Sequence, residues 1–264
     1  MHPIVLGDAE NSAYAERVHQ PVNLEVYVTP PPSEVLRDAA VVVIDVLRAT
    51  TVHEALLSGG AGAIYPVADF AAGVELRDKL GSARLIGEIG ALPPPEADFG
   101  NSPTEFASLN VEGWTVVHVT SNGTRALLGA ESAVQVYSGC LRNLSLTVER
   151  ILAAATERIA VVCSGDQGGT APSVEDTFAG GAYVAAFRQA APKLVLGGGA
   201  RLALRLYEAY DHDPMSGFDD SPHAEHLRSL GFDADLAYAA QVDASAEAAV
   251  LDRDAAGRVF VRSG

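Results

Sequence analysis

Four acidic residues stand in otherwise apolar or small-residue stretches of this 264-residue chain. Asp45 ends the run AAVVVID at 39–45, Glu88 follows a glycine, and Glu175 and Asp176 are neighbours in the sequence. A carboxylate is costly to bury without a partner, so we expect at least some of these four to meet a cation. Adjacent residues diverge by about 100° on a helix, and we expect Asp176 to face the site and Glu175 to cap or pair.

Three arginines stand where polar loops enter predicted helices: Arg48, Arg125 and Arg142. At such a junction a guanidinium and the first backbone amides of the helix can contact the same anion. Lysine occurs only at positions 79 and 193, so most positive charge is carried by arginine. Arginine suits forked contacts with carboxylate, sulfonate or phosphate groups.

The elements that must position these residues alternate along the chain. Residues 39–45 form a β-branched apolar run typical of a strand buried on both faces, and the pattern from 48 to 57 predicts a helix. The order of strand, polar loop and helix recurs from 114 to 128 and from 159 to 187. Weaker strands are predicted at 63–66, 84–87 and 133–137.

This alternation predicts an α/β fold with layered, mixed but mostly parallel sheets, in which ligands bind beyond the carboxyl ends of the strands. The repeated units suggest two similar, interlocked α/β halves around one site. We treat residues 1–264 as a single unit and allow for two subdomains with a boundary near 115–145. A proline-rich stretch at 93–98 predicts a rigid connector, and residues 210–222 predict a loop before a C-terminal helical region.

Composition narrows the class of protein. Lys and Arg number 18 against 34 Asp and Glu, and the net charge of −16 would repel nucleic acids and anionic membranes. No secretory signal is visible in residues 1–17, which predicts a cytoplasmic protein. Cys140 and Cys163 are expected to be reduced core residues. The sequence leaves a homodimer open.

Several common phosphate and metal motifs are missing. Neither lysine precedes Ser or Thr, as a Walker loop requires, and neither cysteine is followed by the arginine of a cysteine phosphatase. Leu47 occupies the position where a haloacid-dehalogenase-type phosphatase has its second aspartate. His223 and His226 lack cysteines nearby, so we interpret them as solvated residues on a helix face and not as a zinc site.

Six motifs remain, and they occur in a fixed order. They are 44–51 (IDVLRATT), 87–88 (GE), 99–103 (FGNSP), 120–126 (TSNGTRA), 142–143 (RN) and 173–180 (SVEDTFAG). On these motifs the chain resembles the 2-phosphosulfolactate phosphatase family, the ComB enzymes of coenzyme M biosynthesis. The resemblance covers about residues 39–245. It implies a magnesium-dependent phosphatase that converts 2-phospho-3-sulfolactate to 3-sulfolactate and phosphate.

The resemblance also implies roles for the motif residues. We expect Asp45, Glu88 and Asp176 to be catalytic, and Asp45, Glu88, Glu175 and Asp176 to supply ligands to Mg²⁺. The expected substrate-binding residues are Arg48, Thr50, Asn101, Ser102, Asn122, Gly123, Thr124, Arg125, Arg142 and Asn143. Attack on phosphorus by Asp45 and attack by a metal-activated water both stay open.

Structural alternatives exist for several of these residues. Asp45 could cap a helix or turn, Glu88 could pair with an arginine, and Asn122 could belong to a tight turn that also serves as an anion nest. Asn101 and Ser102 are ordinary turn and cap residues.

Two departures from the family pattern bear on the substrate. Ser121 replaces a threonine, and Ile89 stands where an arginine often follows the Gly-Glu motif. The alternatives are therefore a phosphatase of another small anionic phosphate ester, a hydrolase or lyase of phosphate-free sulfonates or dicarboxylates, and a non-catalytic anion-binding protein.

Overall fold

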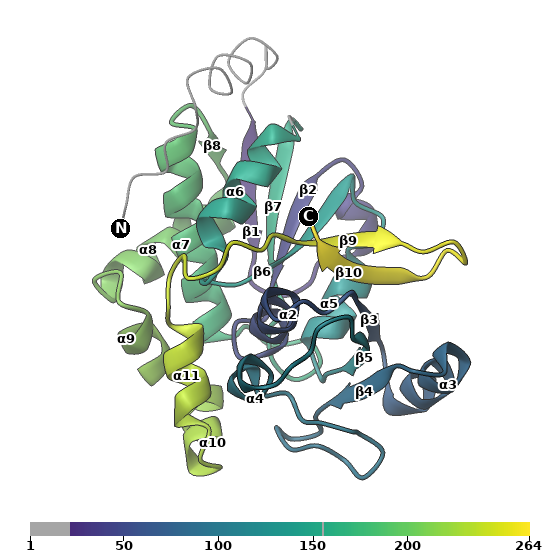
Figure 1. The fold of residues 1–264 in the computed structure, drawn as a ribbon. Coiled ribbons are helices and arrows are strands. Elements are labelled where there is room, and N and C mark those ends of the chain that lie inside the picture. Colours follow the sequence, from purple (N-terminus) through teal and green to yellow (C-terminus); the bar gives the residue numbers. More distant parts are fainter. Residues whose placement is uncertain (1–21, 155) are drawn as a thin grey trace.

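A computed structural model describes residues 22–154 and 156–264 of the chain (Figure 1). The strands are β1 (Asn23–Tyr27), β2 (Ala40–Ile44), β3 (Ala63–Val67), β4 (Arg84–Gly87), β5 (Thr115–Val119), β6 (Gln135–Gly139), β7 (Arg158–Cys163), β8 (Val195–Leu196), β9 (Ala249–Arg253) and β10 (Val259–Ser263). The helices are the 3₁₀ helix η1 (Ser33–Leu36) and the α-helices α2 (Ala49–Ser58), α3 (Phe70–Leu80), α4 (Pro103–Ser108), α5 (Gly123–Gly129), α6 (Leu144–Ala153), α7 (Val174–Ala190), α8 (Gly198–Ala209), α9 (Pro214–Asp219), α10 (Pro222–Ser229) and α11 (Asp233–Ala239).

All ten strands belong to one sheet, in the order β4-β5-β3-β10-β9-β6-β2-β7-β1-β8. Two groups are parallel within themselves: β4, β5 and β3 form one, and β6, β2, β7, β1 and β8 form the other. The hairpin β9–β10 lies between them and pairs antiparallel on both sides. In Figure 1 this yellow hairpin lies between β2 and β3.

The hairpin sets the relative direction of the two parallel groups. Three antiparallel pairings in succession separate β3 from β6, so the groups run in opposite senses through the sheet. Polar loops that follow β2 and β7 in one group and β4 and β5 in the other nevertheless line neighbouring hollows. The candidate site therefore lies where the carboxyl ends of both groups approach each other.

Local sequence explains the elements that carry the site. Every residue of β2, Ala-Val-Val-Val-Ile, is buried, as expected for a central strand covered on both faces. Three helices begin with a capping side chain followed by proline: Ser102 caps α4, Asp213 caps α9 and Ser221 caps α10. The capping oxygen accepts a backbone N–H, and proline at the first helical position has no N–H to leave unpaired.

The structure confirms the predicted α/β class with a mostly parallel sheet, and each predicted strand is present. The prediction of a loop at 210–222 is wrong in part, because Asp213 and Pro214 start the short helix α9 there. Strands β1, β8, β9 and β10 were not predicted. The two similar halves and the boundary near 115–145 stay predictions, and residues 1–17 lie outside the described part.

Cys140 and Cys163 are free and buried, as predicted. Burial raises the pKa of the Cys140 thiol to about 12, so this cysteine is an unreactive core residue. Among the described helices, none combines the length and the apolar character needed to cross a membrane.

Candidate active site

Two adjoining hollows of about 150 Å³ each lie beyond the strand ends. We call the first the α7 hollow, which Ser164, Glu175 and Asp176 help to line. The second is the β4 hollow, which is lined by Arg48, Glu88 and Asn101 among others. Both are lined by Asp45, Leu47, Asn122, Asp166 and His223. Asp45 and Asp166 are thus the two carboxylates that the hollows share, and of these Asp45 is the buried one; the sequence did not single out Asp166 as a candidate.

Asp45 is held by the turn from β2 into α2. Its Oδ1 accepts a hydrogen bond from Ala49 N at 3.2 Å, and Thr50 Oγ1 donates to the Asp45 carbonyl at 2.8 Å. A Cβ at Gly123 would lie 2.4 Å from Asp45 Oδ2, so only glycine allows α5 to start this close to the carboxylate. Gly123 and Thr50 therefore shape the surroundings of Asp45.

The environment of Asp45 disfavours its charge. Burial raises the pKa of its carboxyl to about 6, the Ala49 amide and His223 lower it, and the charges of Glu88 and Glu175 raise it further. Burial also raises the pKa of Asp176 well above its ordinary range, and Asp45 and Glu175 add to the shift. Several carboxyl groups therefore compete for negative charge in a small volume.

The neighbours Glu175 and Asp176 are both buried at the start of α7 and both line the α7 hollow. Asp176 accepts hydrogen bonds from Val46 N at 2.9 Å, Ser164 Oγ at 2.8 Å and Gly165 N at 3.2 Å. It therefore ties the loops after β2 and β7 to α7. Asp176 thus faces the hollow as expected, but Glu175 accepts no hydrogen bond and forms no ion pair in the described part of the chain, so the expectation that it caps or pairs is wrong and its oxygens are available to a ligand.

Glu88 lies after β4 and lines the β4 hollow. Its Oε1 accepts a hydrogen bond from Ser121 N at 2.9 Å, and its Oε2 accepts one from Ala91 N at 2.8 Å. Both oxygens thus hold loop backbone, and the expected alternative of pairing with an arginine does not occur among the ion pairs of residues 22–154 and 156–264.

Arg48 lines the β4 hollow but is already partly neutralised. Its Nη1 donates to Asp235 Oδ2 at 2.8 Å, its Nη2 donates to the Ala91 carbonyl at 2.8 Å, and its guanidinium lies 4.3 Å from the centre of the Phe232 ring. Asp235 also accepts a hydrogen bond from Ser102 Oγ at 2.7 Å. Ser102 therefore caps α4 and holds the partner of Arg48.

The structure does not bring the other two arginines into the hollows. Arg142 is buried elsewhere, where its Nε donates to Glu54 Oε2 at 2.6 Å and its guanidinium lies 3.7 Å from the centre of the Tyr238 ring. Arg125 is exposed, and its Nε donates to the Ala68 carbonyl at 3.3 Å. Neither side chain lines the α7 or the β4 hollow.

Of the remaining predicted substrate-binding residues, some line the hollows and others are buried in the surrounding loops. Asn122 lines both hollows, and its Oδ1 accepts from Gly168 N at 2.8 Å, which leaves the NH₂ group for a ligand. Thr124 is buried and exchanges hydrogen bonds with Thr120 across the loop that starts α5. Asn143 is buried away from the hollows, where its Oδ1 accepts from Cys140 N at 2.9 Å.

Sequence reasoning missed His223 and His226. The interpretation as solvated helix-face residues is wrong for His223, which is half-buried and lines both hollows, while the exposed His226 lies at the rim of the β4 hollow. The Ser-Pro start of α10 directs this face of the helix at Asp45, and the capping Ser221 itself lines the α7 hollow. The Ser-Pro pair predicts the start of a helix, but it does not show where that helix packs.

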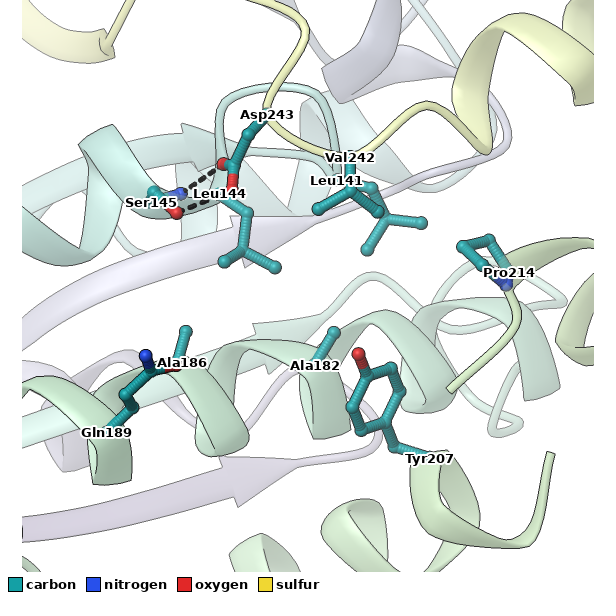
Figure 2. Close-up of a pocket in the computed structure, with 10 residues that line it drawn as sticks. All are labelled: Leu141, Leu144, Ser145, Ala182, Ala186, Gln189, Tyr207, Pro214, Val242 and Asp243. Carbon is teal, nitrogen blue, oxygen red and sulfur yellow. Dashed lines mark hydrogen bonds between the residues drawn. The ribbon is translucent and has the colours of Figure 1, made fainter. Parts of the chain in front are cut away.

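Another cavity lies between α6, α7 and α8 and the segment that contains Val242 and Asp243 (Figure 2). Its lining is mostly apolar, with Leu141, Leu144, Ala182, Ala186 and Tyr207 among the residues. The volume of about 10 Å³ is at most enough for one water molecule. This cavity is a packing defect and not a substrate site.

The chain is similar in sequence to proteins of one known family. The family model described as 2-phosphosulpholactate phosphatase matches residues 28–253. The chain is 35% identical over 215 residues to a protein of Thermus thermophilus, covering 80% of this chain and 87% of that protein. It is 36% identical over 204 residues to a protein of Deinococcus radiodurans, covering 77% and 83% respectively.

Both relatives are named probable 2-phosphosulfolactate phosphatase, as is a Caldicellulosiruptor saccharolyticus protein that is 34% identical over 214 residues, 80% of this chain and 88% of that protein. The chain belongs to the 2-phosphosulfolactate phosphatase family. The matched range contains every side chain assigned above to the two hollows.

Two of the four carboxylates that were expected to bind magnesium suit that ion, but the four do not form a complete set of ligands. No three or more His, Cys, Asp or Glu side chains of the described residues are arranged to hold a metal, so the four expected ligands do not form one cluster. Mg²⁺ is, however, usually bound through one or two carboxylates, with waters and substrate phosphate completing the octahedron. Asp45 and Glu175 are hard oxygen donors of that kind.

Proposed function

We propose that this chain hydrolyses the phosphate monoester of 2-phospho-3-sulfolactate to 3-sulfolactate and phosphate. The carrying observation is the buried carboxylate of Asp45 at the junction of the two hollows, with Glu88, Glu175 and Asp176 around it. No Lys or Arg of the described chain forms an ion pair with any of these four. Family membership supports phosphate ester chemistry at this place.

The charge of the site supports a divalent cation as part of this proposal. A substrate that carries phosphate, sulfonate and carboxylate would meet mainly acidic side chains, and like charges repel strongly where water is excluded. Mg²⁺ bound by Asp45 and Glu175 would neutralise phosphate oxygens and the charge that develops on them during transfer. Arg48 would supply the remaining positive charge, and His223 lines both hollows as a further side chain that can donate a hydrogen bond.

The protein side chains then have distinct tasks. The Asp45 carboxylate, ionised above a pH of about 6, lies at the reacting phosphorus, either as the attacking group or as the base for the attacking water. Asn122 donates its NH₂ to a phosphate oxygen, and Arg48 donates to the sulfonate or carboxylate. Asp176 holds the loops after β2 and β7 in place through its three hydrogen bonds.

The direct test is release of inorganic phosphate from 2-phospho-3-sulfolactate by the purified chain, with 3-sulfolactate as a phosphate-free control. We expect turnover in Mg²⁺, loss of turnover in EDTA and recovery on adding Mg²⁺ back. Faster turnover of another small anionic phosphate ester would correct the substrate but keep the phosphatase. Tight binding with no turnover at any divalent-metal concentration would favour an anion-binding protein and refute the proposal.

Trapping separates the two roles of Asp45. Incubation with substrate labelled with radioactive phosphate, followed by acid quenching and peptide mapping, gives a labelled Asp45 peptide if the carboxylate attacks phosphorus. Activation of water leaves the protein unlabelled, provided that the same sample has released labelled phosphate.

A further inference from the structure

A row of hydrogen-bonded polar side chains leads from the interior of the sheet to the β4 hollow. Ser138 on β6, His53 on α2 and His118 on β5 are completely buried, and Asn101 is 5% exposed. His53 Nδ1 lies 2.9 Å from Ser138 Oγ, His53 Nε2 lies 2.9 Å from His118 Nδ1, and His118 Nε2 lies 2.9 Å from Asn101 Oδ1. Asn101 lines the β4 hollow together with Asp45.

The side-chain oxygen of Asn101, at one end of the row, decides which atom donates in each of the hydrogen bonds. This Oδ1 can only accept, so His118 carries its proton on Nε2 and has a bare Nδ1. His53 must then donate from Nε2 to that nitrogen, and its own Nδ1 accepts from the Ser138 hydroxyl. Every donor in the row has one acceptor when both imidazoles are neutral.

Burial keeps the imidazoles in that state. It lowers the pKa of His53 to about 3, and burial together with the His53 ring lowers the pKa of His118 well below its ordinary value. The row is therefore a fixed arrangement at neutral pH and does not switch with pH. Asn101 is the member of the row whose amide group also lines the β4 hollow.

We propose that His53 and His118 are positioning residues, which hold the Asn101 amide with its oxygen inward and its NH₂ toward the β4 hollow as a donor to an anionic oxygen of the substrate. A freely rotating amide would have to be ordered with its NH₂ toward the anion on binding, whereas a fixed amide is already oriented for that contact. A fixed NH₂ adds an attractive contact in a hollow lined by carboxylates. This inference rests on the proposed function, because that function identifies the anion as the phosphate ester substrate.

The tautomers can be measured in the wild-type chain without any substitution. Nitrogen-15 NMR of the imidazole rings distinguishes Nε2–H from Nδ1–H by the shifts of the two nitrogens. We expect His53 and His118 both to be neutral Nε2–H tautomers at pH 7. Nδ1–H tautomers at both residues would mean that the row runs in the opposite direction, with the Asn101 carbonyl facing the hollow, and would overturn the proposal.

A set of variants tests the consequence for binding. Calorimetry with inorganic phosphate and with 3-sulfolactate gives the affinity for the two products separately. A hydrogen bond to a charged group corresponds to about a tenfold or larger change in Kd, so we expect Asn101→Ala to weaken at least one product by about that factor. His118→Leu should weaken the same product, and His118→Gln, which keeps a donor near the Nε2 position, should restore most of the affinity.

The double variant His118→Leu with Asn101→Ala distinguishes a positioning role of His118 from a general loss of structure. If His118 acts only through Asn101, then His118→Leu adds less than about a twofold change when Asn101 is already alanine. Full additivity of the two substitutions, at equal thermal unfolding temperatures, would contradict the inference. Because tautomers and product affinities need no turnover, a chain that releases no phosphate would refute the proposed function while leaving this test decisive for the histidine row.

Discussion

The Arg142–Glu54 pair and the carboxyl groups of Asp45, Glu175 and Asp176 are all buried, yet only the pair is neutralised by an arginine of the described chain. Arg142 contacts Glu54 at 2.6 Å, packs on Tyr238 and also donates to Gln241. Asp45 forms no ion pair with a Lys or Arg of the described residues, and burial raises its pKa; the Ala49 amide and His223 oppose this shift, and the charges of Glu88 and Glu175 add to it. A paired buried charge is part of the scaffold, whereas a group of buried acids without cations marks a place that a ligand must complete.

The largest effect is expected from removing the carboxylate of Asp45, which is buried and lines both hollows. Asp45→Asn keeps the size of the side chain but removes its charge, so kcat/KM for phosphate release should fall at least 10³-fold, roughly the loss of a key electrostatic group. Stopped assays at saturating Mg²⁺ measure this, with circular dichroism as the check on folding. Near-normal turnover of the variant would contradict every role given to Asp45.

Breaking the neutralised pair should affect stability instead of chemistry. Arg142→Met leaves Glu54 buried without its cation, and the free energy of unfolding in urea should fall by about 3 kcal/mol. The double variant Arg142→Met with Glu54→Gln should recover most of that loss. Arg205→Met, which breaks the exposed pair with Glu208, is the matched control and should change stability little. A large loss in that control would remove the distinction between buried and exposed pairs.

The pH dependence of stability is a further difference between the Arg142–Glu54 pair and the carboxyl groups around Asp45. The folded chain holds a proton on Asp45 up to a pH of about 6, whereas an unfolded aspartate loses it near 4, so the folded state binds more protons in this window. The contribution of Asp45 to the free energy of unfolding should therefore decrease as pH rises from about 4 to about 6. Asp45→Asn should flatten this part of the curve and be more stable at pH 7 by about 1–3 kcal/mol. Urea titrations in EDTA measure it, and an unchanged slope in the variant would contradict the raised pKa.

The smallest effect is expected at Arg125, with Arg48 as its partner in the comparison. Both arginines can be replaced by lysine, which keeps the charge and removes the planar fork. Arg48→Lys should raise KM by about tenfold because Arg48 lines the β4 hollow and holds Asp235 and Ala91. Arg125→Lys should change KM by less than about twofold, and a larger change would place Arg125 at the substrate.

Sequence patterns predicted the features that depend on residues close together in the chain. The β-branched run before Asp45, and the polar loops that follow the strands, correctly predicted the α/β class, and the four acidic residues that they singled out line the hollows; Asp166, which also lines both, was not predicted. Pairings between distant segments leave no local pattern. The hairpin β9–β10, the contact between Glu54 and Arg142, and the approach of His223 to Asp45 are all of this kind.

The expected division between Glu175 and Asp176 illustrates the same limit. Their spacing on a helix is local, but which carboxylate receives hydrogen bonds depends on Val46, Ser164 and Gly165 from two other loops. The proposed anion-binding role of Arg142 likewise rested on its place at a helix start, and its partner lies on a different helix.

The position of the β9–β10 hairpin has a consequence for how the molecule is made. Its strands come after all the others in chain order, yet they are the piece that joins β3 to β6. During synthesis the two parallel groups must wait, unjoined and with open edges, until these residues leave the ribosome. The two groups can therefore be joined only after the hairpin has been synthesised, and a nascent chain stalled before residue 249 would expose two incomplete sheets to chaperones and to aggregation.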